Sequence, residues 1–126
     1  MRAFTRLGEH GAIWIAPGVV SARRRPAARR VALAYVVNQL VKLAVPRHRP
    51  RLDGLPPLIR TGSDRSFPSA HATTSFAGAR VYARTGVPAA PLYALASALA
   101  ASRVWLGVHH PSDVLAGAVL GTLVAR

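Results

Sequence analysis

The sequence predicts an all-α fold, an integral membrane bundle of about four to five helices that forms a single domain over residues 1–126. Of the 126 residues, 51% are hydrophobic, and no segment of any length shows the polar–apolar alternation of a strand. Apolar runs are instead separated by basic or proline-rich blocks, and several of them come near the lower limit of about 17 residues for a membrane span. These observations favour helices over strands.

The first half of the chain contains two helical segments. Residues 11–22 form a short apolar run, for which we expect an interfacial or short membrane helix with Trp14 in the aromatic belt. The block RRRPAARR at 23–30 is strongly basic and precedes a second apolar helix, predicted at 31–46. Residues 47–67 are polar and rich in proline and glycine, which indicates a loop.

Three further helices are predicted in the second half. A helix rich in Ala, Thr and Ser is expected at 68–84, and the sequence TGVPAAP ends it. An apolar helix follows at 91–106. The last helix, at 111–125, begins with Pro111, and proline is well suited to the first turn of a helix.

Small residues on the last two helices are spaced for close packing. Gly117 and Gly121 lie four residues apart in an apolar helix, a spacing that lets two helix backbones approach each other. The preceding helix has two pairs at the same spacing, which are Ala94 with Ala98 and Ser97 with Ala101. A soluble all-α bundle is the alternative on hydropathy alone, and this spacing favours the membrane.

The formal net charge is +13, from sixteen arginines and one lysine against four carboxylates. Nucleic-acid binders of this size are usually more polar, so we expect no nucleic-acid partner. The absence of cysteine excludes a disulfide framework and a thiolate metal site. The carboxylates are dispersed, so we expect no metal ion and no other cofactor. They are Glu9, Asp53, Asp64 and Asp113.

The charged blocks predict an orientation in the cell membrane. If 23–30 is cytoplasmic, the positive-inside rule makes helix 31–46 run outward and places the loop 47–67 outside. The later helices then alternate in a multi-pass chain. Basic residues left on the extracytoplasmic side violate the rule and therefore indicate a function. They are Arg47, Arg49, Arg51, Arg60, Arg65 and Arg103, and the same side holds His48, His71, His109, His110 and Asp113.

The gathering of these groups on one side favours phosphate chemistry. Arginine forks match phosphate oxygens, and two helix N-termini on this side offer free N–H groups to an anion. A neutral imidazole can attack phosphorus when a carboxylate holds its tautomer. Asp113 follows His109 by four residues, and His71 can protonate the leaving oxygen. We interpret His10 and His48, in contrast, as structural residues.

Three motifs lie in order along the chain: KLAVPRHRP at 42–50, PSAH at 68–71 and SRVWLGVHHPSD at 102–113. They resemble the signature of the type 2 phosphatidic acid phosphatase (PAP2) superfamily, which also includes vanadium-dependent haloperoxidases. That signature reads Lys-x6-Arg-Pro, then Pro-Ser-Gly-His, then Ser-Arg-x5-His-x3-Asp. The resemblance covers residues 42–113 and extends to the last helix, and it implies a PAP2-like helical core.

The resemblance implies a role for each matching residue. His109 would be the nucleophile, Asp113 its orienting partner and His71 the general acid. The other matching residues would bind the phosphate oxygens, and they are Lys42, Arg49, Ser69, the backbone N–H of Ala70 and Arg103. The implied reaction is metal-independent hydrolysis of a lipid-linked phosphate monoester or diphosphate through a phosphohistidine intermediate.

The chain departs from the family pattern at two residues. Ala70 replaces the usual glycine, from which we expect a modest effect, and His110 stands where the family often has an aromatic residue. The lipid phosphatases of the family typically have six helices. The resemblance therefore implies that the substrate groove of this chain is open, or that a second copy completes it in a homo-oligomer.

The segments GEHGAIW and SFPSAHAT resemble small actinobacterial members of the family. Some of these are linked to the dephosphorylation of a decaprenylphosphoryl ribose phosphate used in cell-wall synthesis, while phosphatidate and prenyl phosphates stay open as substrates. A vanadate-dependent haloperoxidase is one alternative, although those enzymes are larger and soluble. A non-catalytic basic membrane protein that binds anionic lipids is another, and it would not need His71, His109 or Asp113.

Overall fold

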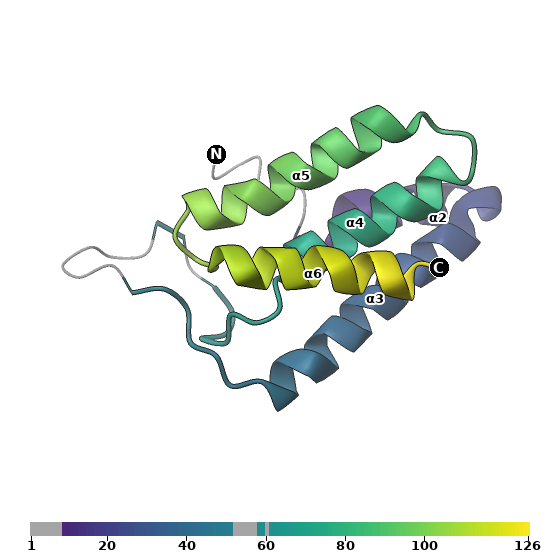
Figure 1. The fold of residues 1–126 in the computed structure, drawn as a ribbon. Coiled ribbons are helices and arrows are strands. Elements are labelled where there is room, and N and C mark those ends of the chain that lie inside the picture. The colour runs from purple at the N-terminus through teal and green to yellow at the C-terminus, as the bar shows by residue number, and fades with distance from the viewer. Residues whose placement is uncertain (1–8, 52–57, 60) are drawn as a thin grey trace.

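Five α-helices and two 3-10 turns make up the regular structure of residues 9–51, 58–59 and 61–126, which the computed structural model describes (Figure 1). In chain order they are η1 (Glu9–Gly11), α2 (Ala12–Val20), η2 (Ala22–Arg24), α3 (Arg25–Ala44), α4 (Ala70–Ala83), α5 (Ala89–Trp105) and α6 (Pro111–Val124). These described ranges contain no strand beyond an isolated bridge between His48 and Arg65, so the predicted all-α fold is confirmed. Asp53 and Arg60 lie outside the described residues.

The helix boundaries agree with the sequence prediction except at the start of α3. The ends of α4, α5 and α6 lie within two residues of the predicted ranges. α3 begins at Arg25 instead of residue 31, so most of the basic block is helical. Pro26 fits its first turn, where an N–H has no helical partner, and Ala and Arg are strong helix formers. The expectation of a separate basic segment is therefore wrong for residues 25–30.

α4 is the centre of the bundle, with α3, α5 and α6 packed around it (Figure 1). A Cβ atom added at Gly117 would lie 2.5 Å from the carbonyl oxygen of Ser69. One added at Gly121 would lie 2.1 Å from the carbonyl oxygen of Thr73, so only glycine lets α6 approach this closely. The packing predicted for the two glycines is confirmed. The similarly spaced residues of α5 are exposed and do not join it to the bundle; they are Ala94, Ser97, Ala98 and Ala101.

Trp14 lies in the core between α2 and α4, not in an interfacial belt. Its side chain is 3% exposed, and its indole N–H donates to Oγ of Ser75 at 3.2 Å. The ring stacks on Tyr82 and covers Gly78, where an added Cβ would lie 2.3 Å from the indole. The belt position predicted for Trp14 is therefore wrong, because the missing side chain of Gly78 opens a slot that buries the ring.

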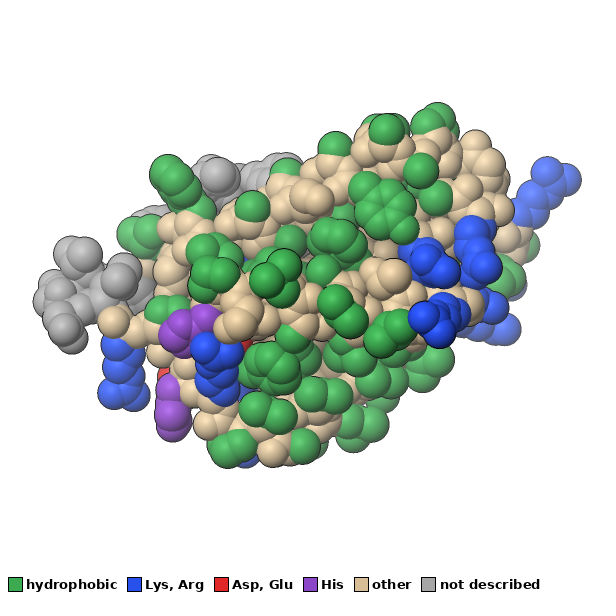
Figure 2. Space-filling model, viewed as in Figure 1, with side chains coloured by type: hydrophobic (Ala, Val, Ile, Leu, Met, Phe, Trp, Pro, Cys, Tyr) green, Lys and Arg blue, Asp and Glu red, His purple; other side chains and the backbone are tan. Residues whose placement is uncertain are grey.

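The outer faces of α3 and α6 carry exposed aliphatic side chains, seen as green patches in Figure 2. On α3 they are Leu33, Val36, Leu40 and Leu43, and on α6 they are Leu115, Val119 and Leu123. A spacing of three or four residues places each set on one side of its helix. Among the described helices, none combines the length and the apolar character that crossing a membrane requires.

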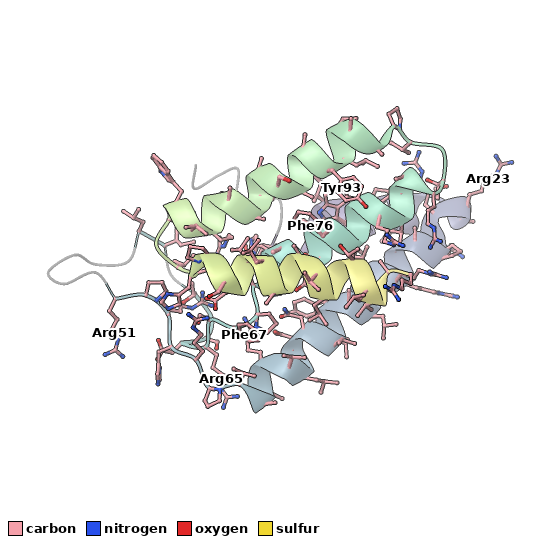
Figure 3. All side chains as sticks on the ribbon, viewed as in Figure 1. Arg23, Arg51, Arg65, Phe67, Phe76 and Tyr93 are labelled. Atoms are coloured by element: carbon pink, nitrogen blue, oxygen red, sulfur yellow. The ribbon has the colours of Figure 1, made fainter. Side chains whose placement is uncertain are left out.

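The alternating direction of the helices gives the bundle two chemically different ends. One end gathers the C-termini of α3 and α5 with the N-termini of α4 and α6 (Figure 1). The other end is basic: Arg23 extends from it (Figure 3), and Arg30 donates a hydrogen bond to the carbonyl oxygen of Arg126. The described carboxylates all lie toward the first end, and they are Glu9, Asp64 and Asp113.

Candidate active site

A cavity of about 790 Å³ opens at the first end of the bundle. Residues from every matching motif line it, and they are Lys42, Arg49, Ala70, His71, Arg103 and His109. Ser69 and Asp113 are fully buried and do not line it. The fold thus brings together segments that are up to 67 residues apart in the chain, from Lys42 to His109.

Three cationic side chains converge on this cavity. Lys42 in the last turn of α3 and Arg103 in the last turn of α5 are only 9% and 5% exposed, while Arg49 from the following loop is half-buried. Burial lowers the pKa of the Arg49 guanidinium, which nevertheless stays charged at neutral pH. Cations that share a cavity repel one another and lose hydration, so an anion between them is strongly favoured.

The loop that carries Arg49 is tied down at several points. The backbone N–H of Arg49 donates to the carbonyl oxygen of Asp64 at 3.1 Å, and its Nε donates to the carbonyl oxygen of Ser63 at 2.8 Å. Arg65 donates to the carbonyl oxygens of Lys42 and Leu43, which are C-terminal acceptors of α3 without helical partners. The charged end of Arg49 is therefore held at a fixed place beside the end of α3.

His109 lies at the meeting point of the three cations. It is 4% exposed, and its Nε2 lies 3.2 Å from Nη1 of Arg49. Because a guanidinium can only donate, Nε2 must accept in this contact, so the ring proton is on Nδ1. Burial first, and then the charges of Arg49, Lys42 and Arg103, lower the pKa of His109 to about 2. The imidazole is therefore neutral, with its lone pair on the nitrogen beside the guanidinium.

Asp113 lies on the other side of the imidazole. Its Oδ2 is 3.6 Å from Nδ1 of His109, which is too long for a hydrogen bond. Within the described part of the chain, Nδ1 has no hydrogen-bond partner. Oδ2 accepts from the backbone N–H of His110 at 2.8 Å, and Oδ1 accepts from Arg47 at 3.0 Å. The carboxylate is thus fixed and faces the nitrogen that carries the proton.

The start of α4 places the second histidine. Ser69 is its N-cap, and its Oγ accepts from the N–H of Ala72 at 3.5 Å. Its own N–H donates to the carbonyl oxygen of Asp113 at 3.0 Å, which joins the start of α4 to the start of α6. Ala70 and His71 then open the helix inside the cavity wall. In this arrangement Ser69 acts as a cap, and its contact with phosphate stays a prediction.

Several residues of the site were not singled out by the motifs. Arg47 pairs with Asp113, and buried Asn38 donates to the carbonyl oxygen of Pro68 and to Oγ1 of Thr73. A second set also lines the cavity and consists of Glu9, His10, Tyr35 and Gln39. The reading of His10 as structural is therefore incomplete. A signal in the sequence was the spacing of Tyr35, Gln39 and Lys42 by four and three residues, which places them on one face of a helix.

Three further residues that the sequence analysis placed near the site lie outside the cavity lining. His48 is exposed and pairs with Asp64 at 2.6 Å, in line with its interpretation as a structural residue. His110 is the N-cap residue of α6, and Arg51 is exposed outside the cavity lining. In the described ranges, no three His, Cys, Asp or Glu side chains are grouped so that they could hold a metal ion.

Comparisons with known proteins agree with the motifs. A family model described as the PAP2 superfamily matches residues 27–126. The chain is 41% identical to a Mycolicibacterium smegmatis protein named decaprenylphosphoryl-5-phosphoribose phosphatase over 92% of this chain and 68% of that protein. A Mycobacterium tuberculosis protein of the same name is 37% identical over 98% and 73%, respectively. The fold is similar to that of Aquifex aeolicus LpxE, with a TM-score of 0.76 over 98% of this chain and 79% of that chain, at 23% identity.

Proposed function

The chain belongs to the PAP2 superfamily, and on that premise we propose that it is a phosphatase that hydrolyses a lipid-linked phosphate ester through a phosphohistidine intermediate. The observation that carries this proposal is the contact between Arg49 and His109. A neutral imidazole nitrogen lies 3.2 Å from a fixed guanidinium. A phosphate bound by that guanidinium therefore has its phosphorus within reach of a nucleophile.

In the first step, Nε2 of His109 attacks phosphorus. A P–N bond forms as the P–O bond to the alcohol breaks, and protonated His71 gives its proton to the leaving oxygen. Lys42, Arg49 and Arg103 neutralise the charge on the non-bridging oxygens, as preorganised cations do in phosphoryl transfer. Asp113 stabilises the imidazolium through Nδ1–H, for which a shortening of the present 3.6 Å separation is enough.

In the second step, water hydrolyses the phosphohistidine. Neutral His71 accepts a proton from the water as the water oxygen attacks phosphorus, and the P–N bond breaks. Nε2 of His109 regains its lone pair, His71 regains its proton, and inorganic phosphate leaves. The N–H groups at the start of α4, including that of Ala70, offer additional donors to the oxygens in both steps.

The substrate that we propose is the 5-phosphate of a polyprenylphosphoryl ribose. The support is the identity of 41% over 92% of the chain to a protein named for that reaction. The cavity is large enough for more than a phosphate group, because its volume of about 790 Å³ lies within the range of small-molecule sites. Phosphatidate and prenyl diphosphates are the competing substrates of the same chemical class.

We propose further that the bundle is a multi-pass protein of the cell membrane with the cavity on the extracytoplasmic side. Exposed aliphatic side chains on α3 and α6 provide a surface for acyl chains. The arginine-rich end that includes Arg23, Arg30 and Arg126 suits the cytoplasmic side by the positive-inside rule. The cavity lies at the opposite end, where a polyprenyl-anchored phosphate could reach it from the membrane surface.

The test is phosphate release by purified protein in detergent with EDTA and no added metal. Decaprenylphosphoryl-5-phosphoribose, phosphatidate and a prenyl diphosphate are compared, and we expect the highest kcat/KM for the first. His109→Ala should abolish release. His48→Ala is the matched control, because His48 is exposed and pairs with Asp64 outside the cavity lining.

Three results would contradict parts of this proposal. Complete loss of activity in EDTA, restored by a divalent ion, would overturn the role of the three cations. A preference for phosphatidate would overturn the ribose substrate but not the reaction. No release from any substrate, together with binding to anionic vesicles, would identify a non-catalytic lipid-binding protein.

A further inference from the structure

The wall of the cavity has a second polar group with chemistry unlike that of the phosphate cradle, the three cations Lys42, Arg49 and Arg103 that are proposed to bind phosphate. It consists of Glu9, His10, Tyr35 and Gln39, and all four line the same cavity as His109. The hydroxyl of Tyr35 is its centre. Nδ1 of His10 lies 2.9 Å from that oxygen, and Nε2 of Gln39 donates to it at 3.0 Å. The imidazole of His10 also meets the Tyr35 ring edge-on, with centroids 5.6 Å apart.

One face of α3 connects this group to the phosphate cradle. Tyr35, Gln39 and Lys42 follow each other by four and three residues, so their side chains lie in one row. At about 1.5 Å per residue, the row extends about 10 Å from Lys42 to Tyr35. A phosphate and the sugar attached to it span a comparable length. Glu9 also interacts electrostatically with Arg103, which links the two groups.

The backbone at His10 is in a conformation that a residue with a side chain rarely adopts. Its φ is 51°, and the next residue, Gly11, has a φ of 74°. A Cβ at Gly11 would lie 3.1 Å from Thr74 of α4, so the turn is pressed against the bundle. Left-handed backbone in a non-glycine residue costs free energy and is often retained at binding sites. Here it places the imidazole against Tyr35 in the cavity wall.

The chemistry of the group fits hydroxyls better than an anion or an acyl chain. A hydroxyl both donates and accepts, and the group offers a carboxylate, an amide, a phenol and an imidazole. A phosphate would be repelled by Glu9, and an acyl chain would exclude water from these polar groups without offering them any hydrogen bond in return. We propose that Glu9, His10, Tyr35 and Gln39 form a subsite for the hydroxyls of a sugar whose phosphate is held by Arg49 and Arg103. This inference rests on the proposed phosphatase function.

The experiment compares two substrates in wild type and in Tyr35→Phe. One is a polyprenylphosphoryl-5-phosphoribose and the other is p-nitrophenyl phosphate, which has no sugar. Loss of a hydrogen bond to a substrate hydroxyl should lower the ratio of the two kcat/KM values about fivefold to tenfold, mainly through KM for the sugar substrate. Tyr93→Phe is the control, because Tyr93 packs on Phe76 outside the cavity lining and should keep the ratio.

A substrate analogue without the ribose 2- and 3-hydroxyls completes the test. The kcat/KM of wild type on this analogue should fall about as much as the kcat/KM of Tyr35→Phe falls on the full substrate. In Tyr35→Phe, removing the two hydroxyls should cause little further fall in kcat/KM, because the interacting groups are already lost. Either of two results would overturn the subsite and make Tyr35 a structural residue. One is that Tyr35→Phe lowers kcat/KM equally on the sugar substrate and on p-nitrophenyl phosphate, and the other is that its effect adds fully to that of removing the hydroxyls. If wild type hydrolyses neither substrate, the proposed phosphatase function fails instead.

Discussion

Nη1 of Arg49 lies 3.2 Å from Nε2 of His109 and donates to the carbonyl oxygen of the preceding residue, Val108, at 2.7 Å. One guanidinium therefore fixes both the ring and the backbone that carries it. The contact also sets the tautomer, since an arginine cannot accept, and it directs the N–H of the ring toward Asp113. When a phosphate oxygen replaces the His109 ring as the partner of Arg49, the lone pair on Nε2 is freed. The phosphorus then lies next to that lone pair.

The carboxylate behind the imidazole yields the first prediction. Asp113→Asn should keep the fold but lower kcat by a factor on the order of 10²–10⁴, as seen for carboxylates that orient a catalytic histidine. The amide keeps the shape of the side chain but cannot stabilise the imidazolium. Phosphate release and thermal unfolding should be measured together, with Asp64→Asn as the exposed control. A folded Asp113→Asn protein with wild-type kcat would disprove the role of Asp113.

The second prediction separates the two histidines. His71→Ala should be slow on an alkyl phosphate and much less impaired on p-nitrophenyl phosphate, because a good leaving group needs little protonation. His109→Ala should stay inactive on both, since it removes the imidazole nitrogen that lies 3.2 Å from Nη1 of Arg49. Equal rescue of the two variants would show that the assignment of acid and nucleophile is incorrect.

The third prediction concerns pH and stability. The pKa of His109 is about 2 in the fold and about 6.5 in an unfolded chain, so between these values only the unfolded chain binds the proton. The free energy of unfolding should therefore fall as pH drops below about 6.5, by about 2 kcal/mol between pH 7 and pH 5. Denaturant unfolding at the two pH values should show this loss in wild type and a smaller one in His109→Gln. The same slope in both proteins would exclude His109 as its source.

The parts of the fold that the sequence predicts are those with a local signal. Proline at 88 and 111 and the loop after α3 mark helix ends, so the last three helices are placed within two residues. The start of α3 was missed because arginines suggest a loop by their charge, whereas their propensity for a helix is high. Burial of Trp14 depends on Gly78, which lies 64 residues away, and no local pattern shows that pairing.

The candidate site likewise has a part that the sequence predicts and a part that only the fold shows. The residues predicted to bind phosphate are visible in the sequence because three motifs keep the spacing of a family signature. The pairing of Arg47 with Asp113 forms only when the end of α3 lies beside α6, and the group of His10, Tyr35 and Gln39 forms only when η1 packs against α3. Tyr35, Gln39 and Lys42 already share helical spacing in the sequence, whereas Arg47 and His10 carry no such signal until the fold brings their partners close.

The fourth prediction tests the close approach of α6 to α4. Gly121→Ala should lower the free energy of unfolding by about 1–3 kcal/mol, because its Cβ would lie 2.1 Å from a backbone oxygen that cannot move away on its own. Gly62→Ala is the control for stability, since a Cβ there meets nothing within 4 Å. The Tm measured by thermal unfolding should be clearly lower for Gly121→Ala than for Gly62→Ala. Equal stability would mean that α6 can shift away from α4 at no cost.

The fifth prediction tests the proposed placement of the cavity on the extracytoplasmic side of the cell membrane. The chain has no cysteine, so single cysteines at two exposed positions, Ser63→Cys and Arg23→Cys, can be labelled without background. Ser63 lies in the loop beside the cavity, and Arg23 lies at the basic end (Figure 3). An impermeant thiol reagent should label Ser63→Cys in intact cells and Arg23→Cys only after the cells are permeabilised. Because both positions are exposed in the fold, burial cannot produce that difference, and the reverse pattern would place the cavity on the cytoplasmic side.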